Sequence, residues 1–216
     1  LFALMSRGTP VALFAHRRVR ERPPSGGVSV LSESISLPKV MTGHALRLLQ
    51  HVNWNGIAMV EFKVDRTTGE PVLIEVNGRF WGSLQLAIDA GVNFPVLLCT
   101  MATGGTLPQT PIGYRAGVRL RWLLGDLDHL LLRLFKANQL SLPPRSPSRL
   151  AAIASFMRFF GRDLQYDVMR RNDMGPFRFE LGRYLANLSR SFFRIGHKVR
   201  RKLVTAVFST GFRSRV

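Results

Sequence analysis

Apolar positions along the first part of the chain fall into short segments that either alternate with polar residues or run without a break, and both patterns predict β-strands. The predicted strands are residues 1–5, 10–19, 57–64 and 71–77. Polar turns, SRGT in the first pair and DRTTGE in the second, join them into two hairpins. After the first hairpin, the paired prolines and glycines of RERPPSGGVS predict a loop.

Between and after the hairpins, apolar residues recur every three or four positions, which is the spacing of a helix with one buried face. Residues 38–52 form the first predicted helix. Two more follow the second hairpin, one from Ser83 to before Gly91 and one from near Asn93 to before TGG. A further strand in YRAGVRLRWLL and a helix in GDLDHLLLRLFK complete the series. This order predicts an α+β fold with an antiparallel sheet and flanking helices.

Composition changes near residue 140, where SLPPRSPSR marks a linker or loop and the helical segments that follow interleave arginine with phenylalanine. Residues 140–216 hold 16 Lys/Arg and 4 Asp/Glu, which is most of the formal net charge of +18. We therefore expect two parts, a domain over residues 1–139 and an Arg-rich helical extension over residues 140–216.

The pattern over residues 184–208 predicts a basic amphipathic helix within this extension. Such a helix can contact an anionic membrane surface or a protein partner, and more often it packs on its own domain. The net charge also favours nucleic acid, but the chain has no known nucleic-acid-reading motif and no aromatic stacking platform, so nucleic acid is not the expected partner. A single cysteine, Cys99, fits a reducing, cytoplasmic location, with peripheral membrane contact as the alternative.

The second hairpin carries polar side chains at alternate positions. If Gly69 takes the left-handed position of the turn, Glu61 lies directly opposite Glu75, and Asn77 follows Glu75 on the same face. The residues of the second strand that are predicted to face the core are Val72, Ile74 and Val76. Two carboxylates and an amide oxygen therefore converge on one patch.

Opposed carboxylates destabilise a hairpin unless something neutralises them. Mg²⁺ takes one or two carboxylates together with water and phosphate oxygens, and Arg79 lies close enough in sequence to reach the same phosphate. The alternative is that Glu61 and Glu75 are solvated residues of an open sheet face beside Lys63. Spacing alone leaves both explanations open.

The segment GIAMVEFKVDRTTGEPVLIEVNGRFWGS resembles the metal-binding segment of the ATP-grasp superfamily, whose members include carbamoyl-phosphate synthase, biotin carboxylase and D-alanine:D-alanine ligase. In that family an acidic or amide residue on one strand and a Glu-x-Asn pair on the next hold two Mg²⁺ ions against the phosphates of ATP. The resemblance implies that Glu61, Glu75 and Asn77 are metal ligands, for Mg²⁺ or alternatively Mn²⁺, and that Arg79 is a catalytic arginine that stabilises phosphate charge. Residues 1–105 resemble, more loosely, the second half of the ATP-binding region.

The resemblance implies an ADP-forming ligase that converts a carboxylate substrate into an acylphosphate and passes the acyl group to an amine-type nucleophile. By the same analogy Arg18 and Arg20 contact the bound cofactor, although a basic edge strand explains them as well. The glycine loop and adenine hinge of the family are not visible in this sequence, so we expect the C-terminal part of a larger ligase, a fragment that is inactive by itself. A noncatalytic ATP-grasp remnant, or a basic module for nucleic acid or an anionic surface, remains the alternative.

Two further acidic residues, Asp126 and Asp128, lie where a helix is predicted to begin. Acidic residues stabilise the positive end of the helix dipole there, which is the simpler explanation, and a second acidic site is the alternative. The histidines show no spacing typical of metal ligands.

Overall fold

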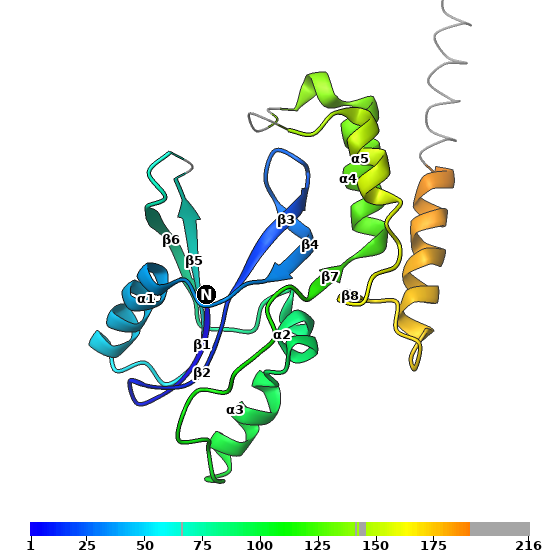
Figure 1. The fold of residues 1–216 in the computed structure, drawn as a ribbon. Coiled ribbons are helices and arrows are strands. Elements are labelled where there is room, and N and C mark those ends of the chain that lie inside the picture. Colours follow the sequence, from blue (N-terminus) through cyan, green and yellow to red (C-terminus); the bar gives the residue numbers. More distant parts are fainter. Residues whose placement is uncertain (66, 141, 143–145, 191–216) are drawn as a thin grey trace, which may run out of the picture. The chain divides into compact units, whose positions relative to one another are not determined.

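The computed structural model describes residues 1–65, 67–140, 142 and 146–190 (Figure 1). Packing divides the chain into two units, residues 1–167 and residues 168–216. The predicted division after residue 139 remains a prediction, and the following elements up to Tyr166 pack within the first unit. Each unit is described by itself below.

The first sheet of the larger unit is antiparallel and has the strand order β2-β1-β5-β6. Its strands are β1 (Phe2–Ser6), β2 (Thr9–Phe14), β5 (Gly56–Val64) and β6 (Pro71–Asn77). Four successive residues of β1, Phe2 to Met5, are buried, which explains why this strand is an unbroken apolar run.

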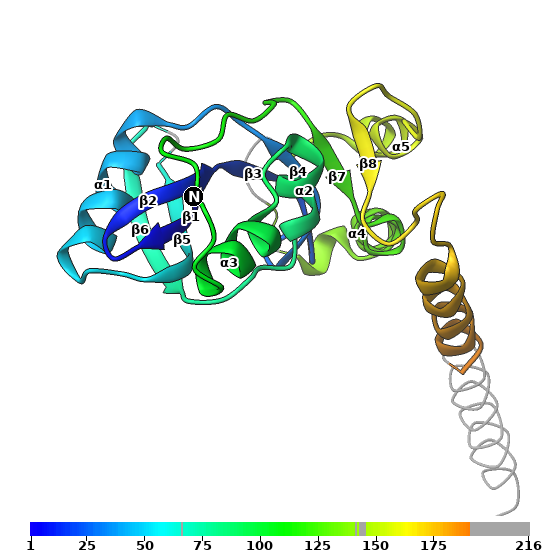
Figure 2. The same ribbon diagram turned by 90° about the horizontal axis from the view of Figure 1, so that it is seen from below.

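Helices cover both faces of this sheet (Figures 1 and 2). On one face α1 (Lys39–His51) buries Ala45 and Leu49 against β1 and β5. On the other face α2 (Leu84–Ala90) and α3 (Phe94–Ala102) pack against Phe2 and Phe14. All three helices lie where the apolar spacing predicts them, and the predicted α+β class is confirmed.

A second sheet, with the order β3-β4-β7-β8, continues the unit. Its strands are β3 (His16–Arg22), β4 (Val28–Ser34), β7 (Arg119–Arg121) and β8 (Leu164–Tyr166), and only the β7–β8 pair is parallel. Helix α4 (Leu123–Phe135) packs on β3, β4 and α5 (Arg149–Phe156), and the short 3₁₀ helix η1 (Ala137–Gln139) follows α4. This sheet brings residues near positions 20, 120 and 165 together.

The prediction of one strand over residues 10–19 was wrong. The segment is two strands, because the chain leaves the first sheet after Phe14 and enters the second at His16. The predicted loop was also too long, since β3 extends to Arg22 and β4 begins at Val28. Gly27 is required in the remaining turn, because a Cβ there would lie 2.4 Å from the carbonyl oxygen of Arg22.

Val72, Ile74 and Val76 were predicted to face the core, but none of them is buried, although Val76 pairs with the buried Val60. They are 58%, 53% and 36% exposed, because β6 is the edge strand of its sheet and the core of α1 reaches only as far as Val60 and Phe62 on the neighbouring strand. Cys99 is exposed on α3.

In the second unit, the structure describes an isolated bridge between Arg170 and Asp173 and a helix over residues 175–190. Residues 184–190 of the predicted amphipathic helix belong to this helix. Residues 191–208 of that prediction lie outside the described part. Among the described residues no single helix has the length and apolar character to span a membrane, while α2 and α3, bent by 94°, meet the length and composition criterion only as a pair.

Candidate functional site

The hairpin of β5 and β6 brings the predicted metal ligands together. Glu61 pairs directly with Glu75, Asn77 pairs with Met59, and Gly69 has the left-handed φ of +76° that the turn requires. The predicted pairing of the two carboxylates is therefore confirmed.

A β-bulge lies between this pair and the turn. Phe62 pairs with Leu73, so Ile74 is the extra residue of β6. Nearer the turn the register differs by one from that predicted, and Leu73 shares a face with Phe62 and not with Glu75. The bulge thus confines the polar face to the end of the hairpin away from the turn, where Glu61, Glu75 and Asn77 lie.

Hydrogen bonds organise these polar side chains. The amide nitrogen Nδ2 of Asn77 donates to Oε1 of Glu75 over 2.7 Å, which leaves the amide oxygen of Asn77 as the atom available to a cation. Arg18 donates from Nη2 to Oε2 of Glu61 over 2.6 Å, and its Nη1 donates to Glu21 over 3.1 Å. Arg18 is therefore the group that offsets the repulsion between Glu61 and Glu75.

The donor set fits a hard divalent cation, since two opposed carboxylates and one amide oxygen are oxygen ligands of the kind that Mg²⁺ and Mn²⁺ prefer. Over the described residues there is no group of three or more His, Cys, Asp and Glu side chains that could hold a metal ion. A cation held by Glu61 and Glu75 would therefore have two charged ligands and would need further oxygen ligands from elsewhere, as is usual for Mg²⁺ bound together with a phosphate.

Arg79 follows β6 and is exposed, and its Nη1 donates to the carbonyl of Phe80 over 3.1 Å. The structure places it two residues beyond Asn77, with its guanidinium on the adjacent main chain. Its contact with a phosphate stays a prediction.

The two arginines predicted as cofactor contacts have different partners. Arg18 reaches the hairpin at Glu61, whereas Arg20 donates to Asp126 of α4 over 2.8 Å and to Ser155 of α5 over 2.9 Å. Irregular pairing on either side of Arg20 breaks the strict alternation of β3 that would have put Arg18 and Arg20 on one face. Only Arg18 lies at the metal-ligand hairpin.

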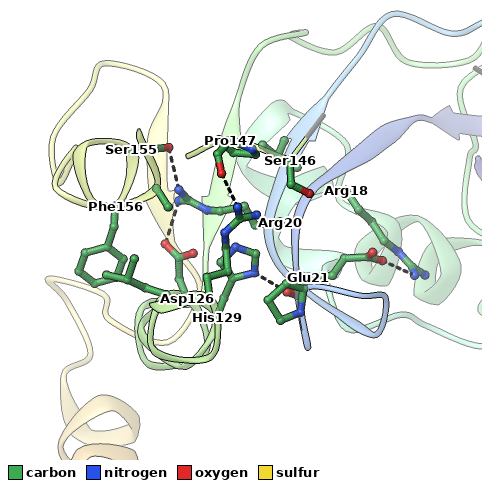
Figure 3. A pocket seen from close by; sticks show the side chains of 14 residues that line it. Arg18, Arg20, Glu21, Asp126, His129, Ser146, Pro147, Ser155 and Phe156 are labelled. Atoms are coloured by element: carbon green, nitrogen blue, oxygen red, sulfur yellow. Dashed lines mark hydrogen bonds and ion pairs between the residues drawn. The ribbon is translucent and has the colours of Figure 1, made fainter. Parts of the chain in front are cut away.

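The sequence did not predict a pocket that lies between β3, α4 and α5 (Figure 3). On α4 it is lined by Asp126, His129, Leu130 and Arg133, at positions i, i+3, i+4 and i+7 of the helix. Three polar residues at the spacing of a buried face, within a largely apolar helix, were the signal that could have revealed it. Asp126 does lie in the first turn, as predicted, but it is fully buried in ion pairs with Arg20 and Arg121.

Burial changes the ionisation of several groups in this unit. It lowers the pKa of His129, and it lowers the pKa of Arg20 despite the opposing effect of the Asp126 carboxylate. It also lowers the pKa of His16 to about 3, with a smaller contribution from Arg18. His16 stacks on Phe2 and hydrogen-bonds Ser83 Oγ over 2.8 Å, so it is held neutral at pH 7.

Comparisons with known proteins identify the family of this chain. A family model described as "ATP-grasp in the biosynthetic pathway with Ter operon" matches residues 6–125. Pyruvate carboxylase from Rhizobium etli is similar in structure, with 20% sequence identity, a TM-score of 0.46, and coverage of 55% of this chain and 13% of that one. No curated protein matches the sequence. Because the family model covers more than half of the chain, including β5, β6 and their carboxylates, the chain belongs to the ATP-grasp family.

Proposed function

We propose that this chain carries the metal- and phosphate-binding part of an ATP- and Mg²⁺-dependent ligase. The enzyme would convert a carboxylate to an acylphosphate and pass the acyl group to an amine-type nucleophile, with release of ADP and phosphate. The observation that carries the proposal is the cross-strand pair of Glu61 and Glu75, with Asn77 hydrogen-bonded beside it, in a chain of the ATP-grasp family.

Glu61, Glu75 and Asn77 would hold the cation as ligands and would not act as acids or bases. A bound Mg²⁺ would supply neutralisation of the charge on the transferred phosphoryl group. The hairpin would position these ligands, since antiparallel pairing holds the Cβ atoms of opposed residues about 4.5 to 5.5 Å apart.

Arg18 would have two roles in this arrangement. Its bond to Glu61 offsets the repulsion of the two carboxylates, and its side chain is 38% exposed, so the guanidinium can turn toward an anion once a cation holds Glu61. Arg79 would be the second arginine of the phosphate site. Its hydrogen bond to Phe80 goes to a carbonyl oxygen and not to a carboxylate. Both would stabilise negative charge on phosphate oxygens.

The test is direct binding of Mn²⁺ to the 216-residue chain, measured by electron paramagnetic resonance with and without ATP. Binding does not require turnover, so the assay tests the hairpin ligands even in a chain that is catalytically inactive by itself. Glu75→Gln should weaken Mn²⁺ binding by about tenfold or more, because one of two charged ligands becomes neutral.

Glu70→Gln is the matched control, since it removes one negative charge from the exposed turn of the same hairpin. It should leave Mn²⁺ binding almost unchanged. Equal losses in the two variants would show that Mn²⁺ senses only the net charge of the hairpin, and undetectable binding in the unchanged chain would favour a noncatalytic remnant.

A further inference from the structure

The pocket between β3, α4 and α5 has a volume of about 350 Å³, which suits a small organic molecule (Figure 3). One wall is formed by residues 18–21 of β3, inside the segment that matches the family model. The opposite wall, from Asp126 to Phe156, begins where that match ends at residue 125. The pocket is therefore built partly from the portion of this chain outside the family match.

Positive charge exceeds negative charge around the pocket. Asp126 accepts from Arg20 over 2.8 Å and from Arg121 over 2.7 Å, both at the same oxygen, Oδ2. Arg133 is 8% exposed and donates to the carbonyl of Pro147, and among the described residues it makes no ion pair. Two guanidinium groups thus share one carboxylate and a third, on Arg133, has none within the described residues, and buried charge without a counter-ion is costly.

His129 adds no further charge at neutral pH. It hydrogen-bonds the carbonyl of Glu21 through Nδ1, and burial lowers its pKa. The excess positive charge of the pocket therefore comes from Arg20 and Arg133.

Three buried polar atoms of the lining residues have no hydrogen-bond partner within the described part of the chain: Nε of Arg20, Nε of Arg133 and Oδ1 of Asp126. Leaving such atoms unpaired costs free energy, which a ligand can recover by pairing them. The two Nε–H groups belong to cations, so an anionic acceptor would pair with them best. The unpaired Oδ1 of Asp126 would pair with a hydrogen-bond donor. The rest of the wall is apolar, with Leu130 and Phe156 on the two helices.

We propose that this pocket binds a small organic carboxylate that carries a hydroxyl or ammonium group next to the carboxylate and an apolar body. The carboxylate lies between Arg20 and Arg133, its neighbouring donor pairs with Asp126 Oδ1, and its body packs on Leu130 and Phe156. A phosphate fits less well, because a dianion without a donor would meet the buried carboxylate of Asp126.

This site is separate from the metal hairpin but adjoins it. Arg18 lines the pocket and also binds Glu61 over 2.6 Å. Binding in the pocket does not depend on ATP or a metal ion, so it goes beyond the proposed function and is tested independently of it.

The experiment is calorimetric titration of the full 216-residue chain, without nucleotide or metal, with three probes: phenyllactate, phenylpropanoate and inorganic phosphate. Phenyllactate should bind saturably. Phenylpropanoate, which lacks only the hydroxyl, should bind about five- to tenfold more weakly, because Asp126 Oδ1 stays unpaired. Phosphate should bind more weakly than phenyllactate.

Arg133→Gln should weaken phenyllactate binding at least about tenfold, because the charge opposite the carboxylate is lost. Arg47→Gln, an exposed arginine on α1, is the control for net charge and should change nothing. Ala152→Leu fills the pocket without changing any charge and should abolish phenyllactate binding. If Arg133→Gln fails to fold, this variant tests whether the acid binds in the pocket.

Several results would overturn the proposal: no saturable binding of either organic acid, phosphate binding tighter than both, equal losses in Arg133→Gln and Arg47→Gln, or undiminished binding by a folded Ala152→Leu variant. Failure of Mn²⁺ binding to the hairpin would leave this outcome unaffected, so the two proposals fail separately.

Discussion

Replacing Asp126 by asparagine should destabilise the fold far more than the same change at Asp128, two residues further along α4. Asp126 has no exposed surface and accepts from Arg20 and from Arg121, which is itself 1% exposed. Without this charge the partners of the Arg121 guanidinium within the described residues are all neutral: the carbonyls of Phe156 and Arg158 and the aromatic rings beside it.

The magnitude follows from burial. Removing one partner of a buried ion pair costs about 3 to 5 kcal/mol, because the other charge is left buried and uncompensated. The pair of Asp128 and Arg22 spans 3.0 Å, but its side chains are 22% and 43% exposed, and such a pair contributes about 0 to 1 kcal/mol. The two variants should therefore differ by about 3 kcal/mol, a large share of the roughly 5 to 15 kcal/mol that stabilises a domain.

The assay is urea unfolding followed by tryptophan fluorescence, with Asp126→Asn, Asp128→Asn and the unchanged chain compared at one pH and one salt concentration. A double variant, Asp126→Leu with Arg121→Met, removes the fully buried pair but leaves Arg20 without its carboxylate, so it should recover only part of the loss. If Asp126→Asn and Asp128→Asn unfold at the same urea concentration, the idea that burial gives the Asp126 cluster its strength is refuted.

Two further predictions concern His16 and Gly27. Burial lowers the pKa of His16 to about 3 from an ordinary value of 6.5, so the unfolded chain binds the proton first and stability falls as the pH drops below about 6.5. Between pH 7 and pH 5 the unchanged chain should lose about 2 kcal/mol more of its unfolding free energy than His16→Gln does, as measured by urea unfolding at both pH values. Parallel pH profiles of the two proteins would contradict this account. Gly27→Ala should lower the unfolding free energy by about 1 to 3 kcal/mol, because its Cβ would lie 2.4 Å from the Arg22 carbonyl oxygen. Gly43→Ala on α1 has open space around it and should be neutral or stabilising. Thermal unfolding midpoints that move equally in both variants would count against the steric argument.

Local sequence patterns were sufficient for the three helices and the second hairpin, but they merged β2 and β3 into one strand. The helices α1, α2 and α3 begin and end within a residue or two of their predicted bounds, because their apolar period, caps and glycines are local features. The pairing of Glu61 with Glu75 was also predictable, since a hairpin is a local structure whose register depends on its turn. The bulge at Ile74 was not predictable in this way, because the pattern of β6 looks regular.

By itself, then, the sequence determined the α+β class, the hairpin that joins the carboxylates, and the resemblance to the ATP-grasp family. Only the tertiary structure decided which sheet each strand joins, why Arg18 and Arg20 separate, and how α4 and α5 meet β3 to form a charged pocket. Periods of two and 3.6 residues describe how a segment folds on itself. Contacts between Arg20 and Asp126, 106 positions apart, depend on long-range packing that no local period encodes.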